Sequence, residues 1–417
     1  MKIISVVGAR PNFMKVAPII AVIGEHNRKL SGREDSQDFI QHLLVHTGQH
    51  YGDLMSDSFF NDLNLPKPDI HMGVGSGTHA AQSAEIMKRF EEILLNEKPD
   101  LVVVVGDVNS TLACALVTAK ISFDSSGTRP LIAHVESGLR SFDRTMPEEI
   151  NRIVTDHVAD LLFVTEDSGI KNLLQEGISA DKIHFVGNTM IDSLLAFQTK
   201  ADASTKLEEL GLRSKVGENG NQPEILPYAL LTMHRPANVD NPQAFQEILT
   251  GLTELATQFP IVFPVHPRTR KRIEEFAVQL PGGVSSNNVP GSAHPRAGIL
   301  LTDPLGYLDF VCLMKHAAIV VTDSGGIQEE TTCLGVPCVT VRDNTERPVT
   351  VDKGTNIVAG TAQQGIKAAI RRQREGNHQH GVPQFWDGRA ASRIVEVLSR
   401  TGQSHSVRTQ NKLQPTF

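Results

Sequence analysis

The 417-residue sequence lacks the features that mark several broad classes of protein. It contains no apolar run near the roughly 18 residues of a membrane span, and its first apolar run is broken at Gly8, so we expect neither a membrane protein nor a signal peptide. Its four cysteines have neither metal-ligand spacing nor a disulfide pattern, which indicates a reducing compartment. The net charge of −7 argues against a general nucleic-acid binder. Together these absences predict a cytoplasmic protein.

What the sequence does contain is an alternation of short apolar runs with amphipathic helical segments. Runs that are apolar along their whole length indicate parallel strands buried on both faces, and their alternation with helices predicts a doubly wound α/β fold. In the first half, the predicted strands cover residues 2–8, 39–48, 101–107, 131–137, 161–166 and 183–188, with helices at 15–26, 78–97 and 147–160. In the second half, strands are predicted at residues 228–234, 261–266, 298–304, 317–324 and 338–343.

A polar interval separates these two sets of strands. Residues 196–227 are rich in charge, Gly and Asn, and we interpret them as a linker with an insertion that holds one short helix. The sequence therefore predicts a Rossmann-like domain over residues 1–195 and a second one over 228–384. A helix at 385–401, which could cross back to the first domain, and a disordered tail at 402–417 complete the expected organisation.

Polar side chains follow the predicted strands in both halves. Ligands of open α/β sheets bind outside the carboxyl ends of the strands, so two such domains facing each other would form a ligand cleft between them. Polar loops are also common without any function, but the number of His and Glu residues at these positions favours one shared site. The loop RDNTERP, which contains Arg342, could line the same cleft. The other residues concerned are Arg10, Gln49, His50, Asp107, Glu136, His234, His266 and Ser324.

Two motifs have the composition of phosphate sites. GARPNFMK lacks the glycine pattern of a dinucleotide fingerprint, but it places the cations Arg10 and Lys15 around a helix start. In TDSGGIQEE, Gly325 and Gly326 would let a diphosphate approach the backbone at the positive end of a helix dipole, and a carboxylate could accept hydrogen bonds from ribose hydroxyls. The usual preference for acids near a helix N-terminus explains the carboxylates, yet it leaves Ser-Gly-Gly unexplained. The second motif therefore predicts a nucleoside diphosphate site.

Several acids and one histidine that follow apolar strands are candidates for proton transfer. They are Asp107, Glu136, Glu148, Glu149 and His234. Asp107 could instead cap the following helix, and because MPEE is typical of a helix start, one of the two adjacent glutamates could be structural. No His–Cys or acidic cluster has the spacing of a metal site, so we expect no metal.

Taken together and in this order, GARPNFMK, HTGQH, GDVNST, HVESGLR, MPEEINR, TMHRPAN, PVHPRT, TDSGGIQEE and RDNTERP resemble the non-hydrolysing UDP-N-acetylglucosamine 2-epimerases. The resemblance extends over nearly the whole chain. It implies the two-domain GT-B fold, a homodimer, and no metal or nicotinamide cofactor. It also implies interconversion of UDP-N-acetylglucosamine and UDP-N-acetylmannosamine for polysaccharide synthesis, through elimination of UDP to a 2-acetamidoglucal and its re-addition.

The resemblance implies roles for individual residues as well. The family's catalytic positions fall on Asp107, Glu136, Glu148 and His234. Its substrate-binding positions fall on Arg10 and Lys15 at the diphosphate, Ser324, Gly325 and Gly326 at phosphate, Glu330 at the ribose, and Arg152 and His266 along the cleft. Gln49 and His50 match a region where some members bind a second substrate molecule as an activator, but residues 73–82 lack the basic residue of those members.

Other activities remain open at this point. A 2-epimerase for a modified UDP-sugar, a hydrolysing 2-epimerase and a GT-B glycosyltransferase would all use a similar cleft. A nucleotide-sugar sensor without turnover is a fourth alternative, against which the several acids argue.

Overall fold

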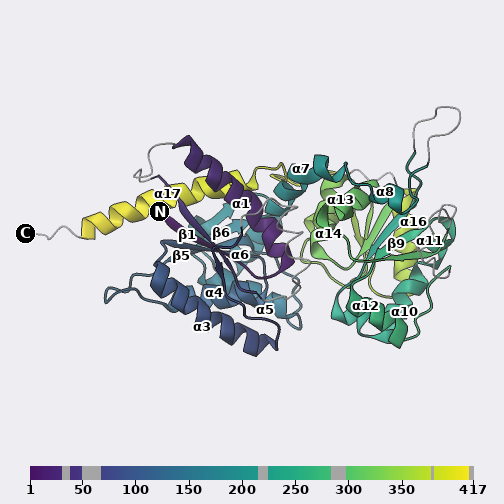
Figure 1. Cartoon of the computed structure of the whole chain (residues 1–417), viewed down its shortest axis with the longest axis horizontal. Coiled ribbons are helices and arrows are strands. Elements are labelled where there is room, and N and C mark those ends of the chain that lie inside the picture. Colours follow the sequence, from purple (N-terminus) through teal and green to yellow (C-terminus); the bar gives the residue numbers. More distant parts are fainter. Residues whose placement is uncertain (31–37, 49–66, 215–223, 283–296, 377–379, 413–417) are drawn as a thin grey trace, which may run out of the picture. The chain divides into compact units, whose positions relative to one another are not determined.

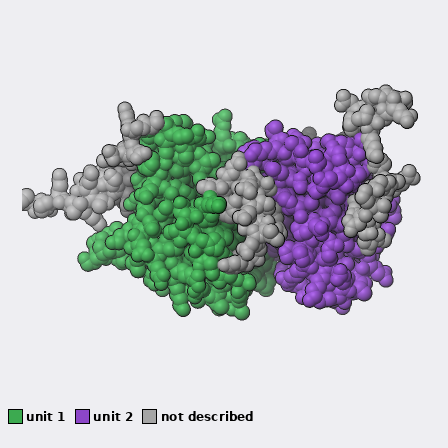
Figure 2. Space-filling view, in the orientation of Figure 1, with its two compact units in different colours: residues 1–195, 384–417 green, residues 196–383 purple. Residues whose placement is uncertain are grey.

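The computed structural model describes residues 1–30, 38–48, 67–214, 224–282, 297–376 and 380–412, with Arg10 and residues 402–412 described by their backbone alone. The chain forms two compact units, shown in different colours in Figure 2. Unit 1 comprises residues 1–195 and 384–417, and unit 2 comprises residues 196–383. Unit 1 is thus assembled from two stretches of chain that are far apart in the sequence.

Unit 1 is built on a parallel sheet of seven strands in the order β3-β2-β1-β4-β5-β6-β7 (Figure 1). Strand β4, with the sequence LVVVV, is buried along its whole length, as expected for a central strand covered on both faces. The strands are β1 (Lys2–Val7), β2 (Gln41–His46), β3 (Ile70–His71), β4 (Leu101–Val105), β5 (Leu131–Ser137), β6 (Leu161–Val164) and β7 (Ile183–Phe185).

Helix α3 (His79–Glu97) shows how local sequence sets the helices of unit 1. Thr78 caps its N-terminus, because the side chain accepts a hydrogen bond from a backbone N–H of the first turn, and Lys98 ends it in a left-handed conformation. Its buried face consists of Gln82, Ile86, Phe90 and Leu94. The other helices are α1 (Arg10–Lys29), α4 (Asn109–Lys120), α5 (Pro147–Val158), α6 (Asp167–Gln175), α7 (Thr189–Ala201), the 3₁₀ turn η1 (Ala180–Lys182) and α17 (Ala390–Lys412).

Unit 2 repeats the same design with a parallel sheet of six strands in the order β10-β9-β8-β11-β12-β13. The strands are β8 (Ala229–Thr232), β9 (Ile261–Pro264), β10 (Ile299–Thr302), β11 (Ile319–Thr322), β12 (Cys338–Thr340) and β13 (Asn356–Val358). The helices are α8 (Lys206–Glu209), α9 (Pro236–Val239), α10 (Pro242–Gly251), α11 (Thr253–Gln258), α12 (Pro267–Glu275), α13 (Tyr307–His316), α14 (Gly325–Leu334), α15 (Val349–Asp352) and α16 (Gln363–Glu375).

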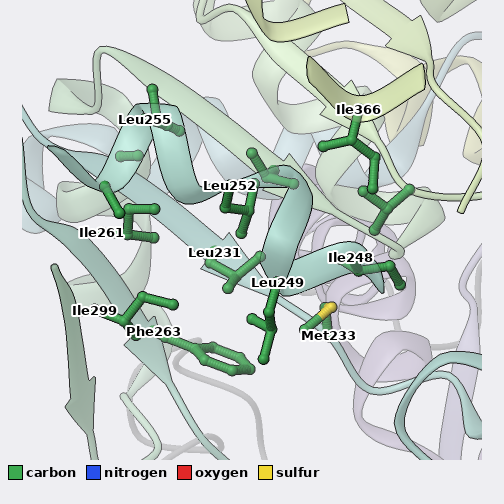
Figure 3. Packing of buried hydrophobic residues seen from close by; sticks show 14 of the residues in the cluster. Leu231, Met233, Ile248, Leu249, Leu252, Leu255, Ile261, Phe263, Ile299 and Ile366 are labelled. Carbon is green, nitrogen blue, oxygen red and sulfur yellow. The ribbon is translucent and has the colours of Figure 1, made fainter. Parts of the chain in front are cut away.

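The core of unit 2 joins one face of this sheet to helices α10, α11 and α16. Figure 3 shows Leu231, Phe263 and Ile299 from the strands beside Ile248 and Leu249 from α10. These side chains are completely buried, and burying each stabilises the fold by about 1.5–3 kcal/mol relative to leaving it in water. This face of the sheet is therefore covered by a closely packed apolar core.

Each sheet has one position where the direction of winding reverses. In unit 1 it lies between β1 and β4, and in unit 2 between β8 and β11. The loops that leave the carboxyl ends of two such strands turn to opposite sides of the sheet and leave a crevice, which is where ligands of this fold bind. The predicted doubly wound α/β class, with a Rossmann-like fold in each unit, is confirmed.

Some elements differ from the sequence predictions. The short strands β3 and β13 were not predicted, because two or three residues carry too little apolar pattern to be distinguished from a loop. We expected disorder from residue 402, whereas the backbone of α17 is helical to Lys412, and no proline interrupts the helix before that point. Among the described helices, none combines the length and the hydropathy needed to cross a lipid bilayer.

Several specific contacts hold the segment that begins at residue 384 against the rest of unit 1. The indole of Trp386 is buried and donates a hydrogen bond to the carbonyl of Thr165 at 2.9 Å. The carboxylate of Asp192 accepts hydrogen bonds from two backbone N–H groups at the start of α17, which packs against α1 (Figure 1). Gly187, with φ +91°, lies so close to Phe385 that a Cβ would collide with its carbonyl oxygen. The docking of α17 therefore depends on a glycine at this position.

We expect Gly187→Ala to destabilise unit 1 by about 1–3 kcal/mol, because alanine disfavours this backbone conformation and its Cβ must displace the chain at Phe385. Urea unfolding followed by the fluorescence of Trp386, the single tryptophan, measures the effect. Gly24→Ala is the control: no atom lies within 4 Å of its added Cβ in helix α1, so this change should be neutral or stabilising by about 0.5–1 kcal/mol. Equal stability of the two variants would contradict the prediction.

Candidate functional site

Asp107 and Arg152 form the first group of predicted site residues that the structure brings together. Asp107 follows β4, and Arg152 projects from α5, with its Nη2 2.5 Å from the Asp107 carboxylate. Arg152 is almost completely buried, whereas a quarter of the Asp107 side chain is exposed. The guanidinium therefore fixes one oxygen of Asp107 while part of the carboxylate stays accessible to a ligand.

The adjacent glutamates of α5 differ sharply in their surroundings. Glu149 is buried and accepts hydrogen bonds from the backbone N–H groups of Ser141 and Phe142, from the Ser141 hydroxyl, and from Arg152 at 2.8 Å. Glu148 is half-buried and makes no hydrogen bond or ion pair with the part of the chain that the structure describes. Of the two, Glu149 is structural, and Glu148 is the one available to a ligand.

Glu136 and Lys15 form a second buried pair at the neighbouring strand end. The Lys15 ammonium lies 2.7 Å from a Glu136 oxygen, and both side chains are at most 6 % exposed. Glu136 has a φ of +70°, a left-handed conformation that costs a non-glycine residue of order 1 kcal/mol and is often found at functional sites. Lys15, expected at the diphosphate, is therefore engaged by a carboxylate, and its tip lies over Gly106, where a Cβ would be 2.8 Å from Nζ.

In unit 2, His234 and Asp323 meet at the crevice between β8 and β11. Nδ1 of His234 lies 2.9 Å from Asp323, which also accepts hydrogen bonds from the backbone N–H groups of His234 and Arg235 and from the Asn238 amide. Burial acts to raise the pKa of Asp323, but these partners outweigh it and the pKa lies below its ordinary value. The ionised carboxylate holds the proton on Nδ1, so the exposed imidazole presents Nε2 outward.

The glycine loop of unit 2, residues 324–326, packs against a buried network of charged side chains. Arg347 pairs with Glu346 and, at 2.8 Å, with Glu329, while Arg342 donates to Glu346 at 2.7 Å. A Cβ at Gly325 would collide with the Arg347 guanidinium and lie 2.7 Å from Glu346. The motif predicts that a ligand approaches the Cα of Gly325. In the structure, the ion pair of Arg347 and Glu346 lies at this position instead.

The remaining predicted residues of unit 2 lie around the same loop and the end of β9. Glu330 is buried and accepts a hydrogen bond from the Tyr307 hydroxyl at 3.2 Å. Ser324 and Gly326 are half-buried at the start of α14. His266 is exposed, and its Nδ1 caps α12 by accepting from the backbone N–H of Arg268 at 3.3 Å.

Three predicted residues cannot be placed in a contact. Gln49 and His50, the expected effector residues, lie outside the described residues. Arg10 is the first residue of α1, as its motif predicted, and only its backbone is described. The expected effector site and the phosphate role of Arg10 stay predictions.

The structure also adds residues that sequence reasoning missed. Asp323 directly follows β11, so the strand-end pattern that selected Ser324 could have selected it too. Glu329 and the Arg347–Glu346 pair carry no such signal, because only the tertiary fold brings them beneath Gly325. Among the described residues, no cluster of three or more His, Cys, Asp or Glu side chains has the geometry to hold a metal ion.

A family model described as UDP-N-acetylglucosamine 2-epimerase matches residues 33–399 of the chain. The chain therefore belongs to the UDP-N-acetylglucosamine 2-epimerase family. The UDP-N-acetylglucosamine 2-epimerase of Methanocaldococcus jannaschii is 39% identical over 401 residues, which cover 96% of this chain and 99% of the relative. The match confirms the family expected from the motifs, and the chain is therefore an isomerase of that family.

A solved structure of this relative and the sequence of a second relative show how far the similarity extends. The crystal structure of the M. jannaschii enzyme in complex with UDP-N-acetylglucosamine and UDP superposes with a TM-score of 0.79, covering 96% of this chain and 100% of that chain at 39% identity. The UDP-2,3-diacetamido-2,3-dideoxy-D-glucuronate 2-epimerase of Pseudomonas aeruginosa is 37% identical over 403 residues, covering 96% of this chain and 100% of the relative. The family thus contains similar members with different sugar substrates.

The two glutamates of α5 provide a matched pair of variants. We expect Glu149→Gln to destabilise unit 1 by roughly 2–4 kcal/mol, because the amide leaves Arg152 without its buried anion and turns an N–H group toward backbone donors. Glu148→Gln should change stability by less than about 0.5 kcal/mol. Urea unfolding monitored through Trp386 compares them, and an equal effect of the two changes would contradict the assignment of Glu149 as structural.

The depressed pKa of Asp323 predicts how the stability of unit 2 depends on pH. Stability contributed by this carboxylate is fully present above its ordinary pKa of 3.8 and is lost as the pH falls through the lower value of the folded state. At neutral pH, Asp323→Asn should therefore cost roughly 2–4 kcal/mol, and the difference from wild type should shrink below about pH 4. Urea unfolding at several pH values, followed by circular dichroism, measures it. A difference that grows on acidification would disprove this account.

Proposed function

We propose that this family member interconverts UDP-N-acetylglucosamine and UDP-N-acetylmannosamine. The observation that carries the proposal is the pair of acids at neighbouring strand ends of unit 1: Asp107, held by Arg152, and Glu136, held by Lys15. Because β4 and β5 are adjacent and parallel, their carboxyl ends lie at the same edge of the sheet. Two carboxylates fixed at one edge suit a reaction that needs a base and an acid at the same carbon.

The chemistry explains why two acids are needed. The C2 proton of the sugar is removed as the C1–O bond breaks and its electron pair leaves with UDP, which gives a 2-acetamidoglucal with a C1–C2 double bond. A proton then returns to C2 on the opposite face, and a UDP oxygen re-forms the bond to C1, so the product has the composition of the substrate. One fixed group cannot reach both faces, so we assign the two proton transfers to members of the set Asp107, Glu136 and Glu148.

The leaving diphosphate requires positive groups, and we assign this role to unit 2. Asp323 orients His234, and Nε2 of the protonated ring would donate a hydrogen bond to a phosphate oxygen. The N-terminus of α14, which begins at Gly325, supplies backbone N–H groups for phosphate oxygens, and Ser324 supplies its hydroxyl. Glu330, fixed by Tyr307, is placed within the same helix as a partner for the ribose hydroxyls.

Proton NMR of the purified protein with UDP-N-acetylglucosamine in D₂O tests the proposal. We expect UDP-N-acetylmannosamine to appear, with deuterium at C2. Asp107→Asn, Glu136→Gln and Glu148→Gln should each be compared, and the two acids that transfer protons should lose on the order of 10²–10⁴-fold in kcat with UDP affinity nearly unchanged. Glu91→Gln, an exposed acid of α3, is the control and should retain full activity. Near-normal turnover in all three site variants would reject the assignment.

A second substrate is supported by the similarity to the P. aeruginosa enzyme, which is 37% identical over nearly the full chain. In that case UDP-2,3-diacetamido-2,3-dideoxy-D-glucuronate would be turned over and UDP-N-acetylglucosamine would not. A parallel NMR assay with both sugars decides between them. Release of free N-acetylmannosamine would instead identify a hydrolysing enzyme.

A further inference from the structure

His134 is a buried histidine whose two ring nitrogens both face hydrogen-bond acceptors. It lies within β5 and is completely buried. Its Nδ1 is 2.6 Å from the Asp156 carboxylate, and its Nε2 is 2.8 Å from the carbonyl oxygen of Gly106. A carbonyl oxygen and an ionised carboxylate can only accept, so both hydrogen bonds require a proton on the ring nitrogen. This arrangement fits an imidazolium and neither neutral tautomer.

The surroundings of Asp156 keep its carboxylate ionised. Its second oxygen accepts hydrogen bonds from the backbone N–H of Gly138 at 3.0 Å and from Arg140 at 2.7 Å. Burial acts to raise the pKa of Asp156, but His134 and Arg140 outweigh it, and the pKa is lowered. Arg140 in turn forms a bidentate pair with Glu176, which also lies 3.3 Å from His157. The Asp156 carboxylate thus accepts hydrogen bonds from His134, Gly138 and Arg140.

This network is attached to the backbone next to both candidate acids. Gly106, whose carbonyl His134 holds, immediately precedes Asp107, and Gly138, whose N–H Asp156 holds, lies two residues after Glu136. Both attachment points need left-handed backbone conformations, since Gly106 has a φ of +65° and Gly138 a φ of +80°, and Glu136 nearby has a φ of +70°. The hydrogen bonds thus stabilise the two strand ends where the backbone departs from regular geometry.

We propose that His134 is a positioning residue, a buried imidazolium that ties the peptide before Asp107 to the turn after Glu136 and so fixes the distance between the two acids. The proposal rests on the proposed function, in which Asp107 and Glu136 belong to the set of three acids that supplies the two proton transfers. Hydrogen bonds from a charged donor are shorter and stronger than neutral ones, particularly where water is excluded. Reaction rates are sensitive to misplacement of reacting groups by as little as about 1 Å, so a rigid tie of this kind raises kcat.

The first test examines protonation and needs no activity. In the ¹⁵N-histidine NMR spectrum of the wild-type protein at about pH 8, where an unperturbed imidazole is neutral, one buried histidine should carry two ring N–H protons protected from solvent exchange. His42, on β2 of the same sheet, provides the contrast, because burial lowers its pKa to about 4 and it should be neutral. A spectrum in which every histidine has an unprotonated nitrogen would overturn the proposal.

The second test separates the two hydrogen bonds. In His134→Asn the amide can replace only the Nδ1 donor to Asp156, and in His134→Gln only the Nε2 donor to Gly106. Both variants should lose on the order of 10–100-fold in kcat, with KM and UDP affinity changed less than about threefold. His42→Asn, which removes a hydrogen bond to Ser5 in the same sheet, is the control and should keep its kcat. A folded His134 variant with wild-type kcat would disprove the positioning role.

The two tests keep this proposal separate from the proposed function. If the wild-type protein does not epimerise UDP-N-acetylglucosamine, the proposed substrate fails, while the protonation of His134 is still decided by NMR. The kcat comparison is then made with the diacetamido-glucuronate sugar nucleotide. A purely structural role would lower the unfolding temperature of both variants and leave kcat unchanged below it.

Discussion

A charge buried at the carboxyl end of a parallel strand must find a partner of opposite sign, and this requirement organises both units. Moving an ion out of water costs several kcal/mol unless it is paired and hydrogen-bonded. Several buried acids of both units, at strand ends and on neighbouring elements, have a cation as partner. Glu136 has Lys15, Asp156 has Arg140, and Glu346 has Arg342. The carboxylates are thereby held in fixed positions.

This constraint also decides which groups are free to meet a substrate. Lys15 and Arg342 have the chemistry of phosphate ligands, yet each is committed to a buried carboxylate. Among the described site residues, Asp107, Glu148, His234 and His266 have more accessible side chains than the buried Glu136. A positive residue after a strand is therefore as much a counter-ion for the acids as a candidate ligand contact.

The sequence predicted the features that depend on local pattern. Runs such as LVVVV could be assigned to buried parallel strands, because a β-branched run of that length has few other stable conformations, and the helix start at Thr78 follows from capping chemistry. The partners of the site residues could not be predicted, since they come from distant parts of the chain. Gly325 illustrates the difference: the motif indicated close approach by some group, and only the fold identifies that group as Arg347. The left-handed conformation of Glu136 had no signal in the sequence either.

The two units apply one topology to different chemistry. In unit 2, His234 and Ser324 follow β8 and β11, the strands that border the reversal of winding; in unit 1, Asp107 follows β4, which borders it, and Glu136 lies at the end of the next strand, β5. Unit 1 fills this position with carboxylates that are held by cations, which suits proton transfer at carbon. Unit 2 fills it with a histidine oriented by an aspartate and with the N-terminus of a helix, which suits the stabilisation of an anion. One sheet topology can therefore present acids in unit 1 and a histidine with a helix N-terminus in unit 2, because only the residues that follow the strands differ.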